Sequence, residues 1–433
     1  MRILLLTDEI WNDRVFGNNV LQNWFEGLEG VVFAQICATP GKPLNTMCTL
    51  YFQITDTMVL RSILGPRAGQ AFEMSYSEML DNPQTRNYIA ESGFYRFMKR
   101  ISGETLRLVR ECLWGMGRID FDALSRFVKE FNPDIVFCPR RLTWKMMRLE
   151  KLVSRVTVAP FVAFTGDDEV SFREYSFSPL FWINRFIFRK AFRRHCGLYK
   201  AYYTLSADQA DEYRNDFRLN TDTLLKCGDF KDDDFSVVKH VGEPIRLIYA
   251  GRLYCNRWRS LAHIGKALRK INEDGVRMVL DIYTQDKLTA KQRKALAEDN
   301  YIYLKGSVTT AELKEVYRQG DIALHVESLD RRNRLLTRIS FSTKIIDLMA
   351  STCAIMAICW SEHTGYKYLK THDAAFCIDS YEDIYQVLKG ICDDPALIHE
   401  YAHRAWYCGM INHSKEEIQN HLIDAFSDII KGN

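Results

Sequence analysis

Residues Leu247–Trp258 read LIYAGRLYCNRW. The apolar run before Gly251 has the length of a buried strand, and a helical pattern follows from about Arg259. Gly251 permits a tight turn and a close approach of the backbone to a ligand. Arg252 and Arg257 fall on the connecting loop, and guanidinium groups suit the geometry of phosphate oxygens. The stretch therefore predicts a strand–loop–helix unit that binds a diphosphate, with two ordinary exposed arginines as the alternative interpretation.

Short apolar runs alternate with longer helical patterns on both sides of this stretch. The expected strands are Ile3–Leu6, Val31–Ile36, Ile135–Cys138, Phe161–Phe164 and Ala201–Leu205 in the first half, and Arg246–Tyr249, Arg277–Tyr283, Ile302–Lys305, Ile322–Val326 and Ala354–Ile358 in the second. This alternation predicts an α/β protein with mostly parallel sheets. A chain of 433 residues has room for two or three domains of about 150 residues. The acidic, proline-stopped segment Lys231–Pro244 is the expected boundary between two of them.

Composition excludes several classes of protein. Hydrophobic residues make up 47% of the chain and charged residues 26%, which is typical of a globular protein, and a net charge of +3 gives no argument for nucleic acid binding. The twelve cysteines include no C-x-x-C pair, which argues against a zinc ribbon and fits free thiols in a reducing cytoplasm. We expect Arg2–Thr7 to be a strand rather than a signal peptide, because the apolar run stops at Thr7.

A second motif, SFSTKIIDLMA, covers Ser340–Ala350. Small hydroxyl residues precede an apolar helical pattern, so Ser340 or Ser342 is the expected N-cap, and the unpaired amides of a helix N-terminus bind anions. Lys344 lies in the first turn, where the helix dipole disfavours a cation, and this indicates an anionic ligand. Asp347, one turn on, could accept hydrogen bonds from ribose hydroxyls. The alternative is an ordinary capped helix with a surface lysine.

These motifs resemble the donor-binding domain of the family-four retaining glycosyltransferases, in particular bacterial surface and capsular polysaccharide members. Tyr249–Arg252 with Arg257 is similar to the family's Gly-Arg…Lys donor-phosphate motif, with Arg257 in place of the usual lysine. Leu304–Val308 resembles the strand–Gly–helix segment, in which Gly306 and Ser307 would flank the nucleotide base. Ser342–Ala350 resembles the Ser-x-Lys variant of the family motif. In the first half, Thr39–Asp56 and Asn132–Val136 agree more loosely.

The resemblance implies a GT-B fold, with two Rossmann-like domains facing a central cleft. Residues 1–235 would form the acceptor-side domain, 244–412 the donor domain, and 413–433 a helix that packs back on the first domain. The implied reaction is transfer of a sugar, a hexose, from a nucleotide-diphosphate sugar to an acceptor hydroxyl with retention. The acceptor would be a sugar, glycolipid or glycan in polysaccharide or glycolipid synthesis. The implied donor site comprises Gly17, Asn18, Gly251, Arg252, Arg257, Gly306, Ser307, Ser340, Phe341, Ser342, Thr343, Lys344 and Asp347.

One departure from the family pattern keeps other functions open. The family has two glutamates separated by seven residues; Asp347 matches the second position, and Ile339, which cannot do polar work, falls at the first. Backbone amides of Phe341–Thr343 could still hold the sugar and diphosphate. A catalytically silent nucleotide-sugar binder or scaffold, and a sugar-nucleotide epimerase of the same fold, are the alternatives.

The first half offers two candidate segments for the chemistry. Acids follow the expected strand Phe161–Phe164, and Asp167 or Asp168 could orient an acceptor hydroxyl or contact the cationic sugar of the transition state; a helix cap is the alternative. The loop with Gly17 and Asn18 would reach the donor phosphates. It lacks the G-x-G-x-x-G pattern of nicotinamide sites.

No metal cofactor is expected, because the arginines and Lys344 would stabilise the departing diphosphate. His363 and His372 are isolated in the sequence. His399 and His403, four residues apart, have a spacing that can bind zinc, but a polar helical face is the favoured interpretation.

Residues 178–200 predict a basic helix without acids. Its expected apolar face comprises Leu180, Phe181, Ile187, Phe188, Ala191 and Phe192, and its cations are Arg185, Arg189, Lys190, Arg193, Arg194 and Lys200. Such a helix could lie on an anionic membrane at its cytoplasmic face. The alternative is a helix that packs on the sheet with its arginines in water.

Overall fold

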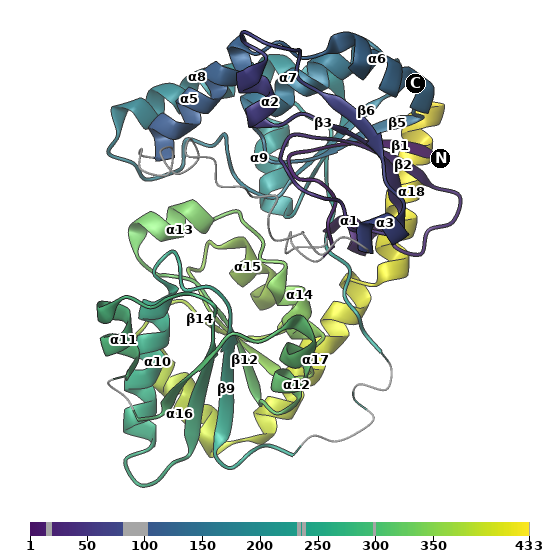
Figure 1. Cartoon of the computed structure of the whole chain (residues 1–433). Coiled ribbons are helices and arrows are strands. Elements are labelled where there is room, and N and C mark those ends of the chain that lie inside the picture. The colour runs from purple at the N-terminus through teal and green to yellow at the C-terminus, as the bar shows by residue number, and fades with distance from the viewer. Residues whose placement is uncertain (14–19, 81–102, 232–234, 236–239, 298–299, 433) are drawn as a thin grey trace. The chain divides into compact units, whose positions relative to one another are not determined.

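The computed structural model describes residues 1–13, 20–80, 103–231, 235, 240–297 and 300–432, and the chain forms two compact units (Figure 1). Unit 1 comprises Met1–Phe172, Ser176–Leu225 and Ile418–Asn433, and unit 2 comprises Arg173–Tyr175 and Lys226–Glu417. Apart from Arg173–Tyr175, the chain enters unit 2 after Leu225, ahead of the acidic segment, and returns to unit 1 within the last helix.

Unit 1 is built on an eight-stranded sheet with the order β4-β3-β2-β1-β5-β6-β7-β8. The strands are β1 (Arg2–Thr7), β2 (Val32–Cys37), β3 (Cys48–Gln53), β4 (Gln70–Glu73), β5 (Ile135–Pro139), β6 (Phe161–Thr165), β7 (Tyr199–Thr204) and β8 (Thr221–Thr223). All neighbours pair in parallel except β3 and β4. The five strands expected in this half are confirmed. The sequence analysis missed β3 and the short, polar β4 and β8.

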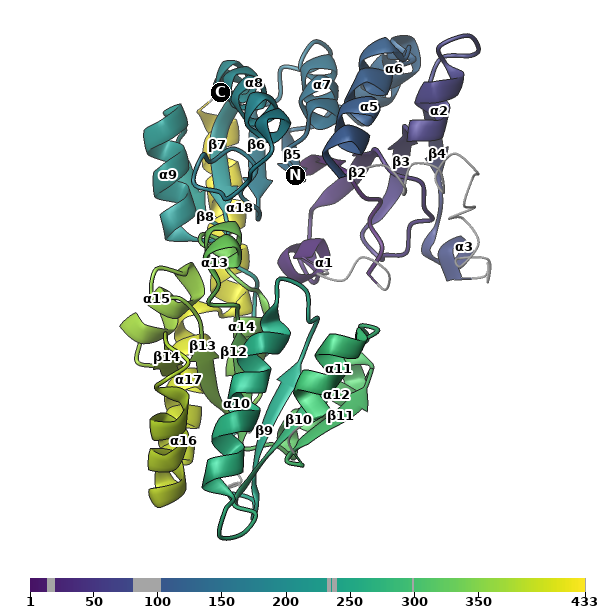
Figure 2. The ribbon, with the colours of Figure 1, turned by 90° about the vertical axis from the view of Figure 1, so that its left-hand side faces the viewer.

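Helices cover both faces of this sheet. They are α1 (Val20–Phe25), α2 (Asp56–Arg61), α3 (Tyr76–Leu80), α5 (Gly103–Met116), α6 (Phe121–Phe131), α7 (Trp144–Val153), α8 (Pro179–His195), α9 (Ala207–Phe217) and α18 (Lys415–Lys431). Figure 2 shows α5, α6, α7 and α8 along one face, where Leu4 and Leu6 join their core. On the other face Phe137 packs against Trp24 of α1 and Phe426 of α18.

Unit 2 has a six-stranded, fully parallel sheet with the order β11-β10-β9-β12-β13-β14. The strands are β9 (Ile245–Ala250), β10 (Met278–Tyr283), β11 (Ile302–Gly306), β12 (Ile322–Val326), β13 (Ala354–Ile358) and β14 (Phe376–Ile378). The five strands expected here are confirmed, and only the three-residue β14 was missed. This order is that of a Rossmann sheet.

The helices of unit 2 also lie on both faces. They are α10 (Arg257–Ile271), α11 (Ala290–Ala297), α12 (Thr310–Arg318), α13 (Arg331–Thr337), α14 (Lys344–Met349), α15 (Thr364–Thr371), α16 (Ile384–Asp393) and α17 (Ala396–Asn412). α10 and α16 pack on the face that presents Leu247 and Tyr249, whereas Ile248 points to the other face, toward Gly320 after α12. Among the described helices of the chain, none is both long and apolar enough to cross a bilayer.

Each sheet reverses its strand order at one point, between β1 and β5 in unit 1 and between β9 and β12 in unit 2. Ligands of open α/β sheets bind beyond the carboxyl ends of the strands at such a switch point. The residues that follow these four strands are therefore the first place to look for a site.

Candidate functional site

At the switch point of unit 2, an arginine and a glutamate form a buried pair. Arg257, the first residue of α10, donates from Nε to Glu327 Oε2 at 3.0 Å and from Nη2 to Glu327 Oε1 at 2.5 Å. The side chains are 12% and 4% exposed, and the Arg257 guanidinium also lies 4.5 Å from the centroid of the Tyr254 ring. Burial opposes the charge of Arg257, but the Glu327 carboxylate outweighs it and raises the pKa of the guanidinium.

Lys344 brings a second cation to the same place. A Cβ on Gly251 would lie 2.7 Å from Lys344 Nζ and 3.1 Å from the Tyr249 hydroxyl, so the ammonium lies close against the glycine at the end of β9. Lys344 remains exposed, and no described residue gives it a hydrogen bond or an ion pair. Desolvation, followed by the charge of Arg257, lowers the pKa of Lys344. An anion bound here would relieve that repulsion.

Arg252 supplies a third, more exposed cation. Its Nε donates to Asp286 Oδ1 at 3.1 Å, and Asp286 Oδ2 accepts from the backbone of Leu253 at 2.6 Å. The Arg252 side chain is 60% exposed. Asp286 therefore holds the loop after β9 while leaving most of the guanidinium in solvent.

The segment before α14 differs in part from expectation. The N-cap of α14 is Thr343, in helical geometry and without a side-chain hydrogen bond, so the expected cap by Ser340 or Ser342 was wrong. Both serines are half-buried, while the Phe341 ring is buried against Tyr368. Because α14 has only six residues, its dipole adds little, and Lys344 itself is the main positive charge.

The other expected donor residues are scattered around unit 2. Asp347 Oδ1 pairs with Lys226 Nζ at 2.5 Å and is half exposed, so its carboxylate already has a cation. Gly306 ends β11 with a φ of +81°, a conformation that favours glycine, and Ser307 after it is exposed. Ile339 is 2% exposed, so the position of the family's first glutamate is part of the core.

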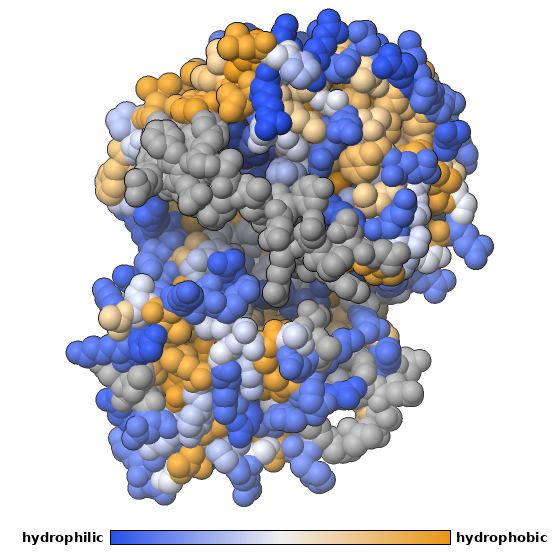
Figure 3. Space-filling view, viewed as in Figure 1, coloured by the Kyte–Doolittle hydropathy of each residue, from blue (hydrophilic) through white to orange (hydrophobic). Residues whose placement is uncertain are grey.

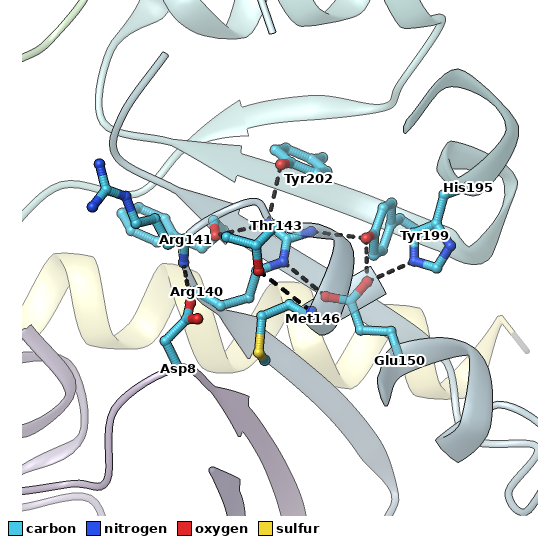
Figure 4. Close-up of polar contacts among 10 residues, drawn as sticks. Asp8, Arg140, Arg141, Thr143, Met146, Glu150, His195, Tyr199 and Tyr202 are labelled. Atoms are coloured by element: carbon cyan, nitrogen blue, oxygen red, sulfur yellow. Dashed lines mark hydrogen bonds and ion pairs between the residues drawn. The ribbon is translucent and has the colours of Figure 1, made fainter. Parts of the chain in front are cut away.

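In unit 1, charged residues also gather at the switch point, where β1 and β5 end (Figure 4). Asp8 pairs with Lys145 at 3.1 Å and accepts from the Arg141 amide at 2.8 Å. Arg141 also pairs with the buried Glu169 at 2.8 Å. Desolvation and then the charge of Asp8 raise the pKa of Glu9. The sequence analysis missed this cluster, although each member follows a strand or begins the next helix.

The two candidate catalytic aspartates behave differently. Asp168 Oδ1 accepts from the amides of Val170 and Ser171 at 3.3 and 2.9 Å, so this carboxylate caps its own loop. Asp167 is exposed, and its backbone carbonyl is held by Gln209 Nε2 at 3.1 Å. Asp167 is thus the better placed of the two to meet a ligand. Gly17 and Asn18 lie outside the described residues.

A buried polar network lies next to this cluster (Figure 4). Arg140 Nε donates to Glu150 Oε1 at 2.8 Å, and both side chains are fully buried. Arg140 also donates to the hydroxyls of Tyr199 and Tyr202, at 2.8 and 3.2 Å. Glu150 Oε2 contacts His195 Nε2 at 2.7 Å. Burial would raise the pKa of Glu150, but Arg140, His195 and Tyr199 outweigh it and lower that pKa to about 2.

Comparison with known proteins defines the fold. No protein-family model and no curated protein matches the chain. Solved structures do match along its whole length. Sucrose-phosphate synthase from Thermosynechococcus elongatus has 10% identity and a TM-score of 0.61, with both chains fully covered. HepE from Anabaena, solved with UDP, has 10% identity and a TM-score of 0.59 over 99% of this chain and 100% of its own.

The chain has the GT-B fold. A variant of TarM from S. aureus, solved with fondaparinux, α-GlcNAc-glycerol and UDP, also matches, at 13% identity and a TM-score of 0.52. That match covers 71% of this chain and only 59% of TarM. The structural similarity establishes the shared GT-B architecture of two Rossmann-like units. Because the sequence identities are so low, it establishes the fold alone, and the chemistry must be argued from the residues themselves.

Proposed function

We propose that this protein is a glycosyltransferase that moves a sugar from a nucleotide-diphosphate sugar to an acceptor hydroxyl. Unit 2 would bind the donor and unit 1 the acceptor. The GT-B neighbours support this: HepE and TarM were solved with UDP, and TarM also with a glycosylated glycerol. Transfer from a diphosphate requires that negative charge on the leaving group be stabilised.

One observation carries the proposal. Lys344 is a cation without a partner among the described residues, placed against Gly251 at the switch point of a Rossmann sheet. Its pKa is lowered by desolvation and then by Arg257, and the charges of Glu327 and Asp347 offset only part of this shift. A diphosphate would supply the missing counter-charge, and the close fit of Gly251 would let it approach the backbone.

The test is nucleotide-dependent thermal stabilisation, measured with a panel of nucleotide diphosphates and nucleotide sugars. At 100 times its dissociation constant a donor should stabilise unit 2 by about 2.7 kcal/mol. We expect Lys344→Ala to abolish most of this stabilisation. Lys389→Ala is the matched control, because Lys389 is an exposed lysine near the end of α16, toward the amino edge of the same sheet. No stabilisation of the wild type by any nucleotide would refute the donor site.

For the chemistry we propose a retaining hexosyltransferase that needs no metal cofactor. The resemblance in the motifs supports retention, and the three cations around Gly251 would take the place of a metal at the diphosphate. Proton NMR of the first product identifies its anomeric configuration. Unchanged turnover in the presence of a chelator is expected if the transfer reaction needs no metal. On the acceptor side Asp167→Asn should lower kcat more than Asp168→Asn, because Asp168 already caps its loop.

A silent nucleotide-sugar binder is the second candidate, because Ile339 is buried where the family has a glutamate. Such a protein would show the same nucleotide-dependent stabilisation without release of nucleotide diphosphate in the presence of any acceptor. An epimerase would instead convert the sugar nucleotide without an acceptor. Product analysis therefore separates the three functions.

We also propose that α8 places the enzyme on an anionic membrane at its cytoplasmic face, where a lipid-linked acceptor would lie. The expected apolar face of this helix was partly wrong: Phe188 and Phe192 are buried, but Leu180 and Ile187 are exposed, and Arg185 is buried. Apolar side chains gather over this part of unit 1 (Figure 3).

A groove of about 750 Å³ between α7 and α8 supports this proposal. Its walls combine apolar residues with cations, among them Trp144, Phe186, Ile187, Lys151, Lys190 and Arg194. Mixed apolar and basic surfaces bind anionic lipid. Sedimentation with vesicles that contain phosphatidylglycerol tests this proposal. The double variant Phe186→Ser, Ile187→Ser should no longer sediment with them. Equal sedimentation of the wild type with neutral vesicles would contradict an anionic partner.

A further inference from the structure

Three potential metal ligands meet at the carboxyl ends of β12 and β13. They are His325 in β12, Cys359 directly after β13, and His363 at the start of α15, and their ligand atoms all lie within 4.8 Å of one another. The residues are 5%, 0% and 2% exposed. The proposed transfer reaction assigns no step to these residues, and the inference that they bind a metal does not rest on that reaction.

The sheet register brings the first two together. β12 and β13 pair in parallel with His325 opposite Ala357. Residues that are opposite in register point to the same face, and Cys359 is two positions after Ala357, so it shares that face. The short loop after Cys359 then turns back, and His363 closes the group as the N-cap of α15.

One ligand atom of this group is buried without a hydrogen bond. His325 Nε2 is buried and has no hydrogen-bond partner among the described residues. A buried polar atom left in this way costs about 1–3 kcal/mol, unless something occupies the space in front of it. Burial lowers the pKa of His325 and of His363, which favours the neutral imidazoles that bind metal, and it raises the pKa of the Cys359 thiol, so the metal must displace that proton.

We propose that His325, Cys359 and His363 bind one thiophilic divalent cation of the Zn²⁺ type, with a fourth position left for water or another ligand. Two imidazoles and a thiolate are typical zinc ligands. In tetrahedral geometry such ligands lie about 3.3–3.6 Å apart, so pairs of ligand atoms up to 4.8 Å apart must close by at most about 1.5 Å. The cation displaces the Cys359 thiol proton to solvent as the metal–sulfur bond forms, so affinity rises with pH.

Binding has a specific structural consequence at α15. His363 Nδ1 now accepts a hydrogen bond from the Gly365 amide at 3.0 Å. Ligation by either ring nitrogen removes this bond, because Nδ1 then carries either the metal or the ring proton. The Gly365 amide therefore loses its acceptor, and its hydrogen exchange should accelerate when the metal binds.

The site also borders the donor residues. His325 and Glu327 are two residues apart, so their side chains share one face of the chain at the end of β12, and Glu327 holds Arg257. A cation at this position adds positive charge close to the proposed diphosphate site.

The experiment titrates metal-free protein with Co²⁺ and then Zn²⁺ under reducing conditions. We expect one equivalent of Co²⁺ to bind with a thiolate-to-metal charge-transfer band that Zn²⁺ abolishes. Cys359→Ser should weaken binding at least about 100-fold, since even partners outside the ligand shell are worth 10–100-fold. Cys353→Ser is the matched control, because Cys353 is buried at the amino end of the same strand. Cys112→Ser removes the exposed cysteine.

The outcomes decide the proposal. Retention of the band in Cys353→Ser and Cys112→Ser, its loss in Cys359→Ser, and faster exchange at Gly365 on metal binding support it. No bound Co²⁺ in the wild type, or a band that disappears with Cys112 rather than Cys359, would overturn it. If Cys359→Ser fails to fold, the wild-type titration and the exchange at Gly365 still give the answer.

Discussion

The Arg140–Glu150 pair of unit 1 and the Arg257–Glu327 pair of unit 2 have the same chemistry and different surroundings. Each pair joins a residue that directly follows a strand at the switch point, Arg140 or Glu327, to a residue of a helix. The first is fully buried, and Tyr199, Tyr202 and His195 occupy its remaining hydrogen-bonding positions. The second keeps 12% of its arginine exposed and lies beside an exposed lysine that no described residue pairs.

This difference separates a structural pair from a candidate binding pair. In the unit 1 pair, each further partner forms a hydrogen bond with Arg140 or Glu150. The pair therefore has no unpaired charge to offer a ligand. In unit 2 Glu327 forms hydrogen bonds with Arg257 alone, and the net effect of the surroundings still lowers the pKa of Lys344, whose ammonium lies against Gly251. The environment of a buried ion pair, rather than its presence, distinguishes the two units.

The largest effect should come from Glu150→Gln. This change leaves the Arg140 charge buried without a counter-charge, which costs about 3–5 kcal/mol. Denaturant unfolding measures the loss, and hydrogen exchange should accelerate in β5–β7 but not in unit 2. Glu130→Gln, an exposed position on α6, should stay within about 0.5 kcal/mol. Equal losses in the two variants would show that the network does not stabilise unit 1.

Acid should remove almost as much stability from unit 1. The Glu150 pKa is about 2 in the folded protein and about 4.5 for an ordinary glutamate, so the folded state binds fewer protons. Its contribution of about 3 kcal/mol is therefore present above pH 4.5 and lost as the pH falls from 4.5 to 2. Unfolding free energies over this range measure it. Glu150→Gln should lack this component, and an identical pH profile in the variant would contradict the assignment.

Arg257→Ala should cost unit 2 less, about 2 kcal/mol. Glu327 loses two charge-assisted hydrogen bonds, but this pair is already partly open to water and Lys344 remains nearby. Arg259→Ala, an exposed arginine two residues along α10, is the control. Denaturant unfolding without nucleotide measures both. A cost as large as that of Glu150→Gln would remove the distinction between the two pairs.

Lys344→Ala should have the smallest effect on stability. Without an anionic partner, and with Arg257 as a repelling neighbour, its removal should change the unfolding free energy by no more than about 0.5 kcal/mol in the absence of nucleotide. Calorimetry of the apo protein checks this. A loss above 1 kcal/mol would mean that Lys344 is a structural residue, and the unit 2 pair would then resemble the unit 1 pair.

The sequence predicted the fold better than the site. Every strand expected from an apolar run is present, because buried parallel strands must be apolar on both faces. The strands that were missed are short or lie toward sheet edges, where that pressure is weaker. Of the site, Gly251 and Lys344 could be predicted from local motifs. Glu327 and the Asp8 cluster could have been found by reading the residues that follow each strand.

The sequence by itself determined two α/β halves, a Gly-Arg turn after a strand and a lysine before a helix, because these depend on residues close together in the chain. Only the tertiary structure decided which charges meet. Glu327 pairs with Arg257 across 70 residues, and His363, isolated in the sequence, joins His325 and Cys359. Parallel strands place residues at one edge whatever their separation along the chain, so their register, which no local pattern records, sets these contacts.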